Sequence, residues 1–291
     1  MNSLDRHRIA RNFSGAAADY EQHAVLQKLV SERLLSRLDL IKLTPEWIID
    51  AGSGVGITAR TLKKKYRRAR VIQIDLSRAM LFHSMKKSSR WFSGQHFVCA
   101  DAEQLPVATA RIDLVFSSLM LQWCNDLDRT LAEAGRVLRS NGLYLFATLG
   151  PGTLRELRES WARVDDGSHV HTFVDMHDIG DALVRVGLEG VVMESENITL
   201  TYKECTGLMR DLKALGAINA NTFRHKGLTG RHKLQHMMQN YESYRVAGSL
   251  PATYEVIYGH AWAVGERTRL TRSGQAVLVP VTSIKRNKNA E

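Results

Sequence analysis

The stretch WIIDAGSGVGITAR, Trp47 to Arg60, decides the fold expected for this chain. An apolar run ends in Asp50, and three glycines follow at alternate positions, Gly52, Gly54 and Gly56, before a segment of helical character. Glycines between a strand and a helix let the backbone approach a ligand closely and leave the helix N-terminal N–H groups available to it. The stretch therefore predicts a strand, a ligand-binding loop and a helix.

The spacing of the glycines argues against a dinucleotide ligand. The dinucleotide fingerprint G-x-G-x-x-G requires a glycine three residues after Gly54, where this chain has Ile57. The third glycine, Gly56, comes one residue early. NAD is therefore not the ligand we expect.

The segments around this loop alternate between strand and helix. Helical stretches are expected through Tyr66, Lys87 and Leu138, and they are separated by apolar runs, WIIDA, RVIQID, HFVCA, IDLVFSS and GLYLFATL. Strands that are apolar along their whole length and separated by helices indicate a parallel sheet covered on both faces. With 44% hydrophobic residues among 291, we expect one α/β domain that carries an insertion.

The form Asp50-x-Gly52-x-Gly54-x-Gly56 resembles motif I of the class I S-adenosylmethionine-dependent methyltransferases. The resemblance implies a Rossmann-like, seven-stranded, mostly parallel sheet with one antiparallel member in the last strand pair. It implies that Asp75 binds the ribose hydroxyls, that Asp101 binds the adenine amino group, and that Ser117 to Leu119 line the methionine end. The implied cofactor-binding residues are Asp50, Gly52, Ser53, Gly54, Asp75, Leu76, Asp101, Ala102, Ser117 and Leu119. The alternative is that Asp75 and Asp101 only cap helices and the glycines only form a tight turn.

Segments outside the cofactor motif resemble a narrower family, the malonyl-acyl-carrier-protein O-methyltransferases of biotin synthesis. They are FSGAAADYEQHAVLQ (13–27), LQWCNDL (121–127), LGPGTLRELRESW (149–161), HTFVDMHDIGDALVRVG (171–187), DLKALGAIN (211–219), GLTGR (227–231) and PATYEVIYGHAW (251–262). The family transfers a methyl group from S-adenosylmethionine to the free carboxylate of a malonyl group on acyl carrier protein. That carboxylate is ionised at pH 7 and needs no general base, so alignment and exclusion of water should provide the rate.

We expect the whole chain, 1–291, to form one methyltransferase domain. Residues 1–44 form a helical lid, with one amphipathic helix from Tyr20 to Leu40. Residues 45–150 form the cofactor-binding core, 151–250 a substrate cap that includes the sixth strand, 251–284 the last strand, and 285–291 a disordered polar tail.

A carboxylate nucleophile needs donors beside the cofactor's methyl group. Tyr20, His23 and Gln27 are spaced to share one face of the expected lid helix. The other candidate catalytic residues are Gln122 and Trp123, which follow the fourth strand, and Arg155, which opens the cap. Our hypothesis is that Arg155, or His23 with Tyr20, orients the malonyl carboxylate. The alternative is that these residues are packing aromatics, a satisfied histidine and a solvated arginine.

Charge favours an acidic partner. The chain has 40 Lys and Arg against 30 Asp and Glu, a net charge of +10, and acyl carrier protein is acidic. We expect the basic run of the insertion to bind the carrier, through Arg224, Lys226, Arg231 and Lys233. The runs at 63–70 and 86–90 are expected to be solvated faces, and a generally basic, solubilising surface is the alternative.

The remaining features limit the functions to be considered. Three cysteines without a CxxC pair, and His232 and His236 without further ligands, lead us to expect no metal. No leader or membrane-spanning apolar run is visible, so a cytoplasmic protein is expected, with the oligomeric state left open. A nucleic-acid methyltransferase and a non-catalytic cofactor-binding module are the rivals. Against the former, no aromatic-interleaved basic groove is visible, and no membrane or nucleic-acid partner is expected.

Overall fold

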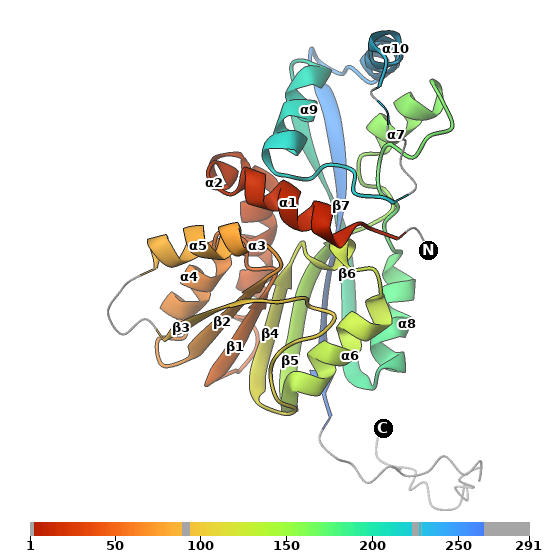
Figure 1. Ribbon diagram of the computed structural model, residues 1–291. Helices are drawn as coiled ribbons and strands as arrows, with labels where there is room; N and C mark the ends of the chain where they lie inside the picture. The colour runs from red at the N-terminus through yellow and green to blue at the C-terminus, as the bar shows by residue number, and fades with distance from the viewer. Residues whose placement is uncertain (1–2, 89–93, 223–226, 228, 265–291) are drawn as a thin grey trace, which may run out of the picture.

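The computed structural model describes residues 3–88, 94–222, 227 and 229–264. A seven-stranded sheet with the order β3-β2-β1-β4-β5-β7-β6 forms its centre (Figure 1). The strands are β1 (Trp47–Ala51), β2 (Arg70–Asp75), β3 (Gln95–Cys99), β4 (Ile112–Ser118), β5 (Leu138–Leu149), β6 (Leu188–Tyr202) and β7 (Leu250–Ala263). Only β7 runs antiparallel to its neighbours. The predicted α/β class and mostly parallel sheet are confirmed. The predicted extension of the last strand to 284 and the tail 285–291 lie outside the described residues.

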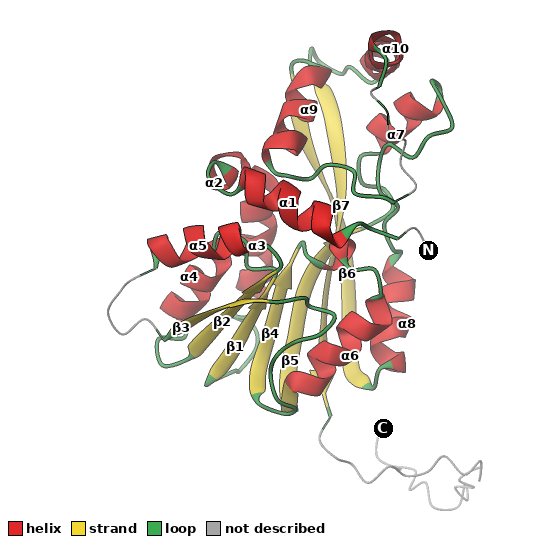
Figure 2. Ribbon diagram, in the orientation of Figure 1, coloured by secondary structure: helices red, strands yellow, loops and turns green. Residues whose placement is uncertain are grey.

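Helices cover both faces of this sheet, and strands β1, β2, β4, β5 and β7 are mostly buried, whereas the edge strands β3 and β6 are mostly not. Neighbouring residues Ile48 and Ile49 of β1 belong to opposite core clusters, as alternation along a strand requires. One cluster includes α3 (Val25–Arg37) and α4 (Ile57–Lys65), and the other includes α6 (Leu127–Val137) and α8 (Met176–Arg185) (Figure 2). Helix α5 (Arg78–Lys87) follows β2.

The lid differs from the single helix that we predicted. It contains α1 (Arg6–Ala16), which the sequence analysis did not identify, then α2 (Tyr20–His23) and α3. Ala24, fully buried, leaves the helical conformation with φ −77° and ψ 49°, and this ends α2. The break turns α3 down onto the sheet while α1 crosses above the carboxyl ends of the strands (Figure 1).

The cap stands on two strands that are longer than the rest. Strands β6 and β7 have 15 and 14 residues, against 5 to 7 in β1 to β4, so they extend beyond the carboxyl ends of the other strands. Around this extension lie α7 (Arg155–Ala162), α9 (Cys205–Ala214) and α10 (Arg231–Glu242) (Figure 1). Lid, strand ends and cap therefore face one another. None of the helices in the described ranges is long and apolar enough to cross a membrane.

Candidate active site

The glycine loop is held in a left-handed backbone by the strand beside it. Gly52 and Gly54 have φ of 75° and 53°, and Gly52 N donates to Ile74 O at 2.8 Å. Gly54 N donates to Asp75 Oδ2 at 2.8 Å. A Cβ on Gly56 would lie 1.9 Å from Ser84 Oγ, so the third glycine lets α5 pack against the loop, whereas a Cβ on Gly54 would point into open space.

A cavity lies beside this loop, at the carboxyl ends of β1, β2, β3 and β4. It is small, about 110 Å³, and its lining includes six of the predicted cofactor-binding residues: Gly52, Gly54, Asp75, Leu76, Asp101 and Ala102. Leu119, the seventh, lines it from the end of β4. The sequence prediction and the cavity thus agree on the loop and on the two carboxylates after β2 and β3.

Three predicted residues, Asp50, Ser53 and Ser117, do not line this cavity. Ser117 is fully buried, and because side chains alternate along a strand, Ser118 and Leu119 line the cavity instead. Asp50 and Ser53 are buried beneath the loop. Within the described residues, Asp50 Oδ2 and Ser53 Oγ have no hydrogen-bond partner, which is unusual for buried polar atoms.

Two carboxyl groups at the cavity have altered acidity. Burial, with the nearby Asp75 carboxylate, raises the pKa of Asp50 to about 7. Burial also raises the pKa of Asp75 to about 6, although its hydrogen bonds from Ser77 N and Gly54 N favour the ionised form. A ligand that offers donors or positive charge here would lower both pKa values.

The sequence analysis missed several residues of the cofactor cavity: Ile9, Phe13, Met80, Met120 and Cys124. Ile9 and Phe13 belong to α1, a helix that we did not predict. Met80 comes from α5, and Met120 and Cys124 flank the short 3₁₀ helix Leu121–Trp123. These three are apolar or weakly polar side chains, and nothing in their residue type indicates a contact with a cofactor, so only the fold reveals their position.

A second cavity, larger and mostly lined by apolar groups, adjoins the first. Its volume is about 470 Å³, and its walls come from the lid, the ends of β4, β5, β6 and β7, and the cap. Four residues line both cavities: Phe13, Tyr20, Leu119 and Trp123. We call these four the junction. The two cavities therefore meet at these four side chains.

The junction is built with local strain. Leu119 adopts φ 54°, a left-handed backbone that is costly for leucine, and Leu154 on the opposite wall of the larger cavity adopts φ 52°. Gln122 Nε2 donates to Leu119 O at 2.8 Å, and its Oε1 accepts from Thr148 Oγ1 at 3.2 Å. Gln122, a predicted catalytic residue, therefore supports Leu119 with its amide while lining the cavity.

Aromatic contacts connect the junction to lid and cap. Trp123 makes edge-to-face contacts with Phe13 at 5.2 Å and with His171 at 5.3 Å between ring centroids. Burial, with the Asp75 carboxylate nearby, raises the pKa of Tyr20, so its phenol stays protonated and can donate. Burial lowers the pKa of His171, which favours the neutral ring.

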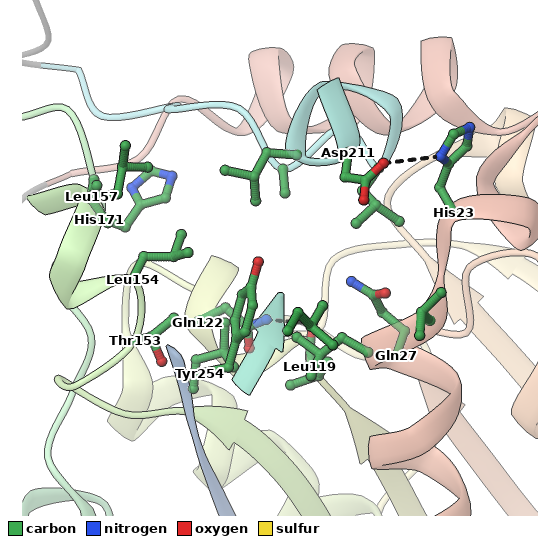
Figure 3. Close-up of a pocket in the computed structure, with 18 of the residues that line it drawn as sticks. His23, Gln27, Leu119, Gln122, Thr153, Leu154, Leu157, His171, Asp211 and Tyr254 are labelled. Atoms are coloured by element: carbon green, nitrogen blue, oxygen red, sulfur yellow. Dashed lines mark hydrogen bonds and ion pairs between the residues drawn. The ribbon is translucent and has the colours of Figure 1, made fainter. Parts of the chain in front are cut away.

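No lysine or arginine is among the described residues that line the larger cavity. His23 lies 3.5 Å from Asp211 through Nδ1, a contact that joins α2 to α9 (Figure 3). The Gln27 amide points into the cavity, and its Oε1 has no partner in the described part of the chain (Figure 3). Tyr20, His23 and Gln27 do face one cavity, although the break at Ala24 places them on two helices.

Arg155 does not have the position that the sequence suggested. It is absent from the lining of the larger cavity, where its neighbours Leu154 and Leu157 lie. Its side chain is 61% exposed, with Nε 3.5 Å from Oε1 of the buried Glu156. Apolar side chains occupy the inner face of the first turn of α7, so the polar Arg155 points outward. This outward position does not support a contact of Arg155 with the malonyl carboxylate, which stays a prediction.

The predicted carrier-binding residues are only partly described. Arg224 and Lys226 lie outside the described residues. Arg231 and Lys233 are exposed on α10, and Lys233 Nζ pairs with Asp165 Oδ2 at 2.9 Å. The described ranges contain no group of three or more His, Cys, Asp or Glu residues placed to hold a metal.

Comparisons with known proteins agree with this architecture. A family model described as a methyltransferase domain matches residues 49–146. The malonyl-[acyl-carrier protein] O-methyltransferase of Methylovorus sp. (strain MP688) is 49% identical over 272 residues, 92% of each chain. That of Gallionella capsiferriformans (strain ES-2) is 47% identical over 287 residues, 97% of this chain and 98% of the relative. Phosphoethanolamine N-methyltransferase 2 of Haemonchus contortus, solved with S-adenosyl-L-methionine, shares the fold with TM-score 0.53 at 16% identity, over 86% of this chain and 57% of that one. On the identities to these two full-length relatives, the chain belongs to the family of malonyl-[acyl-carrier protein] O-methyltransferases.

Proposed function

We propose that this protein transfers the methyl group of S-adenosylmethionine to the free carboxylate of a malonyl group carried on acyl carrier protein. The observation that carries the proposal is the junction, Phe13, Tyr20, Leu119 and Trp123, which links the cofactor cavity to an acceptor cavity without lysine or arginine in its described lining. The ester formed would hide the charge of the carboxylate while the chain is elongated toward biotin.

The residues of the smaller cavity fit S-adenosylmethionine. Asp75 and Asp101 both line this cavity, and their carboxylates would accept hydrogen bonds from the ribose hydroxyls and from the adenine amino group, respectively. Gly54 faces open space in which backbone and ligand can meet. When bound, the cofactor supplies an electrophilic methyl group on a positively charged sulfur, which takes the electron pair of the broken C–S bond.

The acceptor cavity suits the chemistry of a carboxylate nucleophile. The attacking oxygen carries negative charge and the sulfonium positive charge, and both are lost when the O–C bond forms and the C–S bond breaks. An apolar surrounding that excludes water disfavours the separated charges relative to the transition state. A fixed guanidinium would instead stabilise the carboxylate and occupy its lone pairs. The absence of such a cation from the described lining supports this acceptor.

Neutral donors would orient the carboxylate. The Tyr20 phenol at the junction and the Gln27 amide in the acceptor cavity can donate without removing the nucleophile's charge. The strained backbone at Leu119 and its support by Gln122 define the wall against which the reacting groups align. Burial in the cavity would exclude the water that competes for the carboxylate.

The test is methyl transfer from labelled S-adenosylmethionine to purified malonyl-acyl carrier protein. Malonyl-coenzyme A, acetyl-acyl carrier protein and bulk tRNA serve as parallel acceptors. We expect label on the malonyl carrier that ester hydrolysis releases, and none on the acetyl form. Label on tRNA alone, or cofactor binding without transfer to any acceptor, would refute the proposed reaction and favour one of the two rival functions.

A further inference from the structure

Arg6, the first residue of α1, joins the lid to the cofactor cavity by two carboxylates. Its Nη1 lies 2.8 Å from Asp101 Oδ2, and its Nη2 donates to Glu103. The Glu103 side chain is buried and also accepts from Asn125 N at 2.7 Å. One guanidinium from the lid therefore bridges both acidic side chains of the loop that follows β3.

These contacts fix the orientation of the Asp101 carboxylate. Asp101 Oδ1 accepts from Glu103 N at 2.9 Å, while Oδ2 faces Arg6. A carboxylate has about four acceptor positions, so two are in use and the others remain for a ligand in the cavity that Asp101 lines. With both oxygens held, the side chain cannot turn its free acceptor positions away from that cavity.

The lid does not depend on Arg6 for its attachment. Leu4 N donates to Asn125 Oδ1 at 2.6 Å, and Asn125 Nδ2 donates to Leu4 O at 3.1 Å. Asp5 N donates to Ala220 O at 2.9 Å, which ties the same segment to the cap. Removal of the Arg6 guanidinium leaves these backbone contacts in place. Loss of the Arg6 guanidinium should therefore change the orientation of the Asp101 carboxylate more than the position of α1.

We propose that Arg6 is a positioning residue for adenine recognition: it holds the Asp101 carboxylate so that this group accepts a hydrogen bond from the exocyclic amino group of the cofactor. The inference rests on the proposed function in one respect, that the cofactor is S-adenosylmethionine. The inference adds that the lid, through Arg6, contributes to the recognition of adenine.

The test compares two ligands that differ at one position of the base. S-adenosylhomocysteine carries the adenine amino group, and S-inosylhomocysteine has a carbonyl oxygen there, an acceptor that faces the carboxylate. Calorimetry on the wild-type protein should show at least about tenfold tighter binding of the adenosyl ligand. Arg6→Ala should reduce this ratio to about threefold or less, and Arg6→Lys, which keeps the charge but not the planar fork, should be intermediate.

Matched variants separate positioning from general damage to the lid. Arg11→Ala removes an exposed arginine from the same helix and should leave the ratio unchanged. Asp101→Asn should itself reduce the ratio, and adding Arg6→Ala to it should change the ratio little further, because both act on one contact. Thermal unfolding of each free variant identifies any loss of folding.

If Arg6→Ala weakens both ligands equally and keeps the wild-type ratio, Arg6 only closes the lid and the inference is overturned. If wild-type protein binds neither ligand, the cofactor of the proposed function is wrong, which is a different outcome. Wild-type binding of both with equal affinity would show that Asp101 does not read the amino group, and the inference would again fall.

Discussion

The cofactor cavity and the acceptor cavity meet at the junction, yet the chain builds them in different ways. The cofactor cavity is formed largely by short segments that directly follow β1, β2, β3 and β4, and its polar groups are carboxylates and backbone N–H groups. The acceptor cavity collects side chains from Phe13 to Tyr254, which come from the lid, the strand ends and the cap and lie mostly outside the cofactor motif.

This difference separates two kinds of chemical requirement. The cofactor has donors and acceptors at fixed distances, so a few polar residues at the ends of parallel strands can bind it. The malonyl group requires a dry space, donors that do not neutralise it, and alignment with the methyl group. Such a space can be enclosed by many combinations of side chains. The largest effects should therefore come from single changes at the cofactor loop.

The largest effect is expected for Gly54→Ala. Its Cβ meets nothing within 4 Å in the free protein, so folding should lose only about 1 kcal/mol for the left-handed backbone. The same methyl group would occupy the space of the cofactor, and affinity for S-adenosylhomocysteine should fall about 100-fold. Calorimetry and thermal unfolding measure the two effects. Gly52→Ala is the contrast, because its Cβ would lie 2.5 Å from Met120 and should destabilise the fold as well. If Gly54→Ala binds S-adenosylhomocysteine as tightly as wild type, the expectation that changes at the cofactor loop have the largest effect is wrong.

An intermediate effect is expected for Gln27→Glu in the acceptor cavity. A second negative charge in a cavity without described lysine or arginine should repel the malonyl carboxylate and raise KM for malonyl-acyl carrier protein about tenfold at pH 8. Affinity for S-adenosylhomocysteine should change less than about twofold. Gln27→Met, similar in size and uncharged, is the control and should show the smaller cost of a lost donor. An unaltered KM in Gln27→Glu would mean that the carboxylate binds elsewhere.

A smaller effect is expected from pH. The folded chain holds protons on Asp50 and Asp75, with pKa values of about 7 and 6, that the unfolded chain releases near the ordinary value of 3.8. At these two groups the folded state thus binds more protons in this window, so their contribution to the free energy of unfolding should fall as pH rises from about 4 to about 7.

Cofactor binding should reverse this protonation. A positively charged ligand that donates to Asp75 favours the ionised forms of this carboxyl group and of the nearby Asp50, so binding should release protons below about pH 7 and be about threefold to tenfold weaker at pH 6 than at pH 8. Calorimetry in buffers of different ionisation enthalpy measures the release. Asp50→Asn should reduce it, and a proton uptake would contradict the assignment.

The smallest effect is expected for Arg155→Ala. Because the side chain is 61% exposed and does not line the acceptor cavity, kcat and KM for the malonyl carrier should stay within about twofold of wild type. Steady-state kinetics checks this. A tenfold rise in KM would instead support a contact between Arg155 and the malonyl carboxylate, in spite of the exposed position of this side chain.

The residues of the cofactor cavity could largely be predicted from the sequence, because short sequence motifs identify them. Gly52, Gly54, Asp75 and Asp101 each lie at the carboxyl end of a parallel strand, and parallel strands bring these ends together whatever lies between them. Three of the predicted cofactor-binding residues do not line the cavity, and the reasons are short-range. Side chains alternate along β4, so Ser118 lines the cavity and Ser117 is buried, and Asp50 and Ser53 are buried at the glycine loop.

The acceptor half could not be predicted in the same way. The amino-acid sequence alone was enough to predict the parallel sheet, the glycine loop, the two carboxylates at the strand ends and the family. Periodicity, glycine spacing and strand ends can be recognised from residues that are neighbours in the sequence. Only the tertiary structure decided that Ala24 breaks the lid, that Trp123 meets Phe13 and His171, and that Arg155 points away. These contacts depend on how helices from distant parts of the chain pack over two long strands, and packing of that kind has no signature in any one segment.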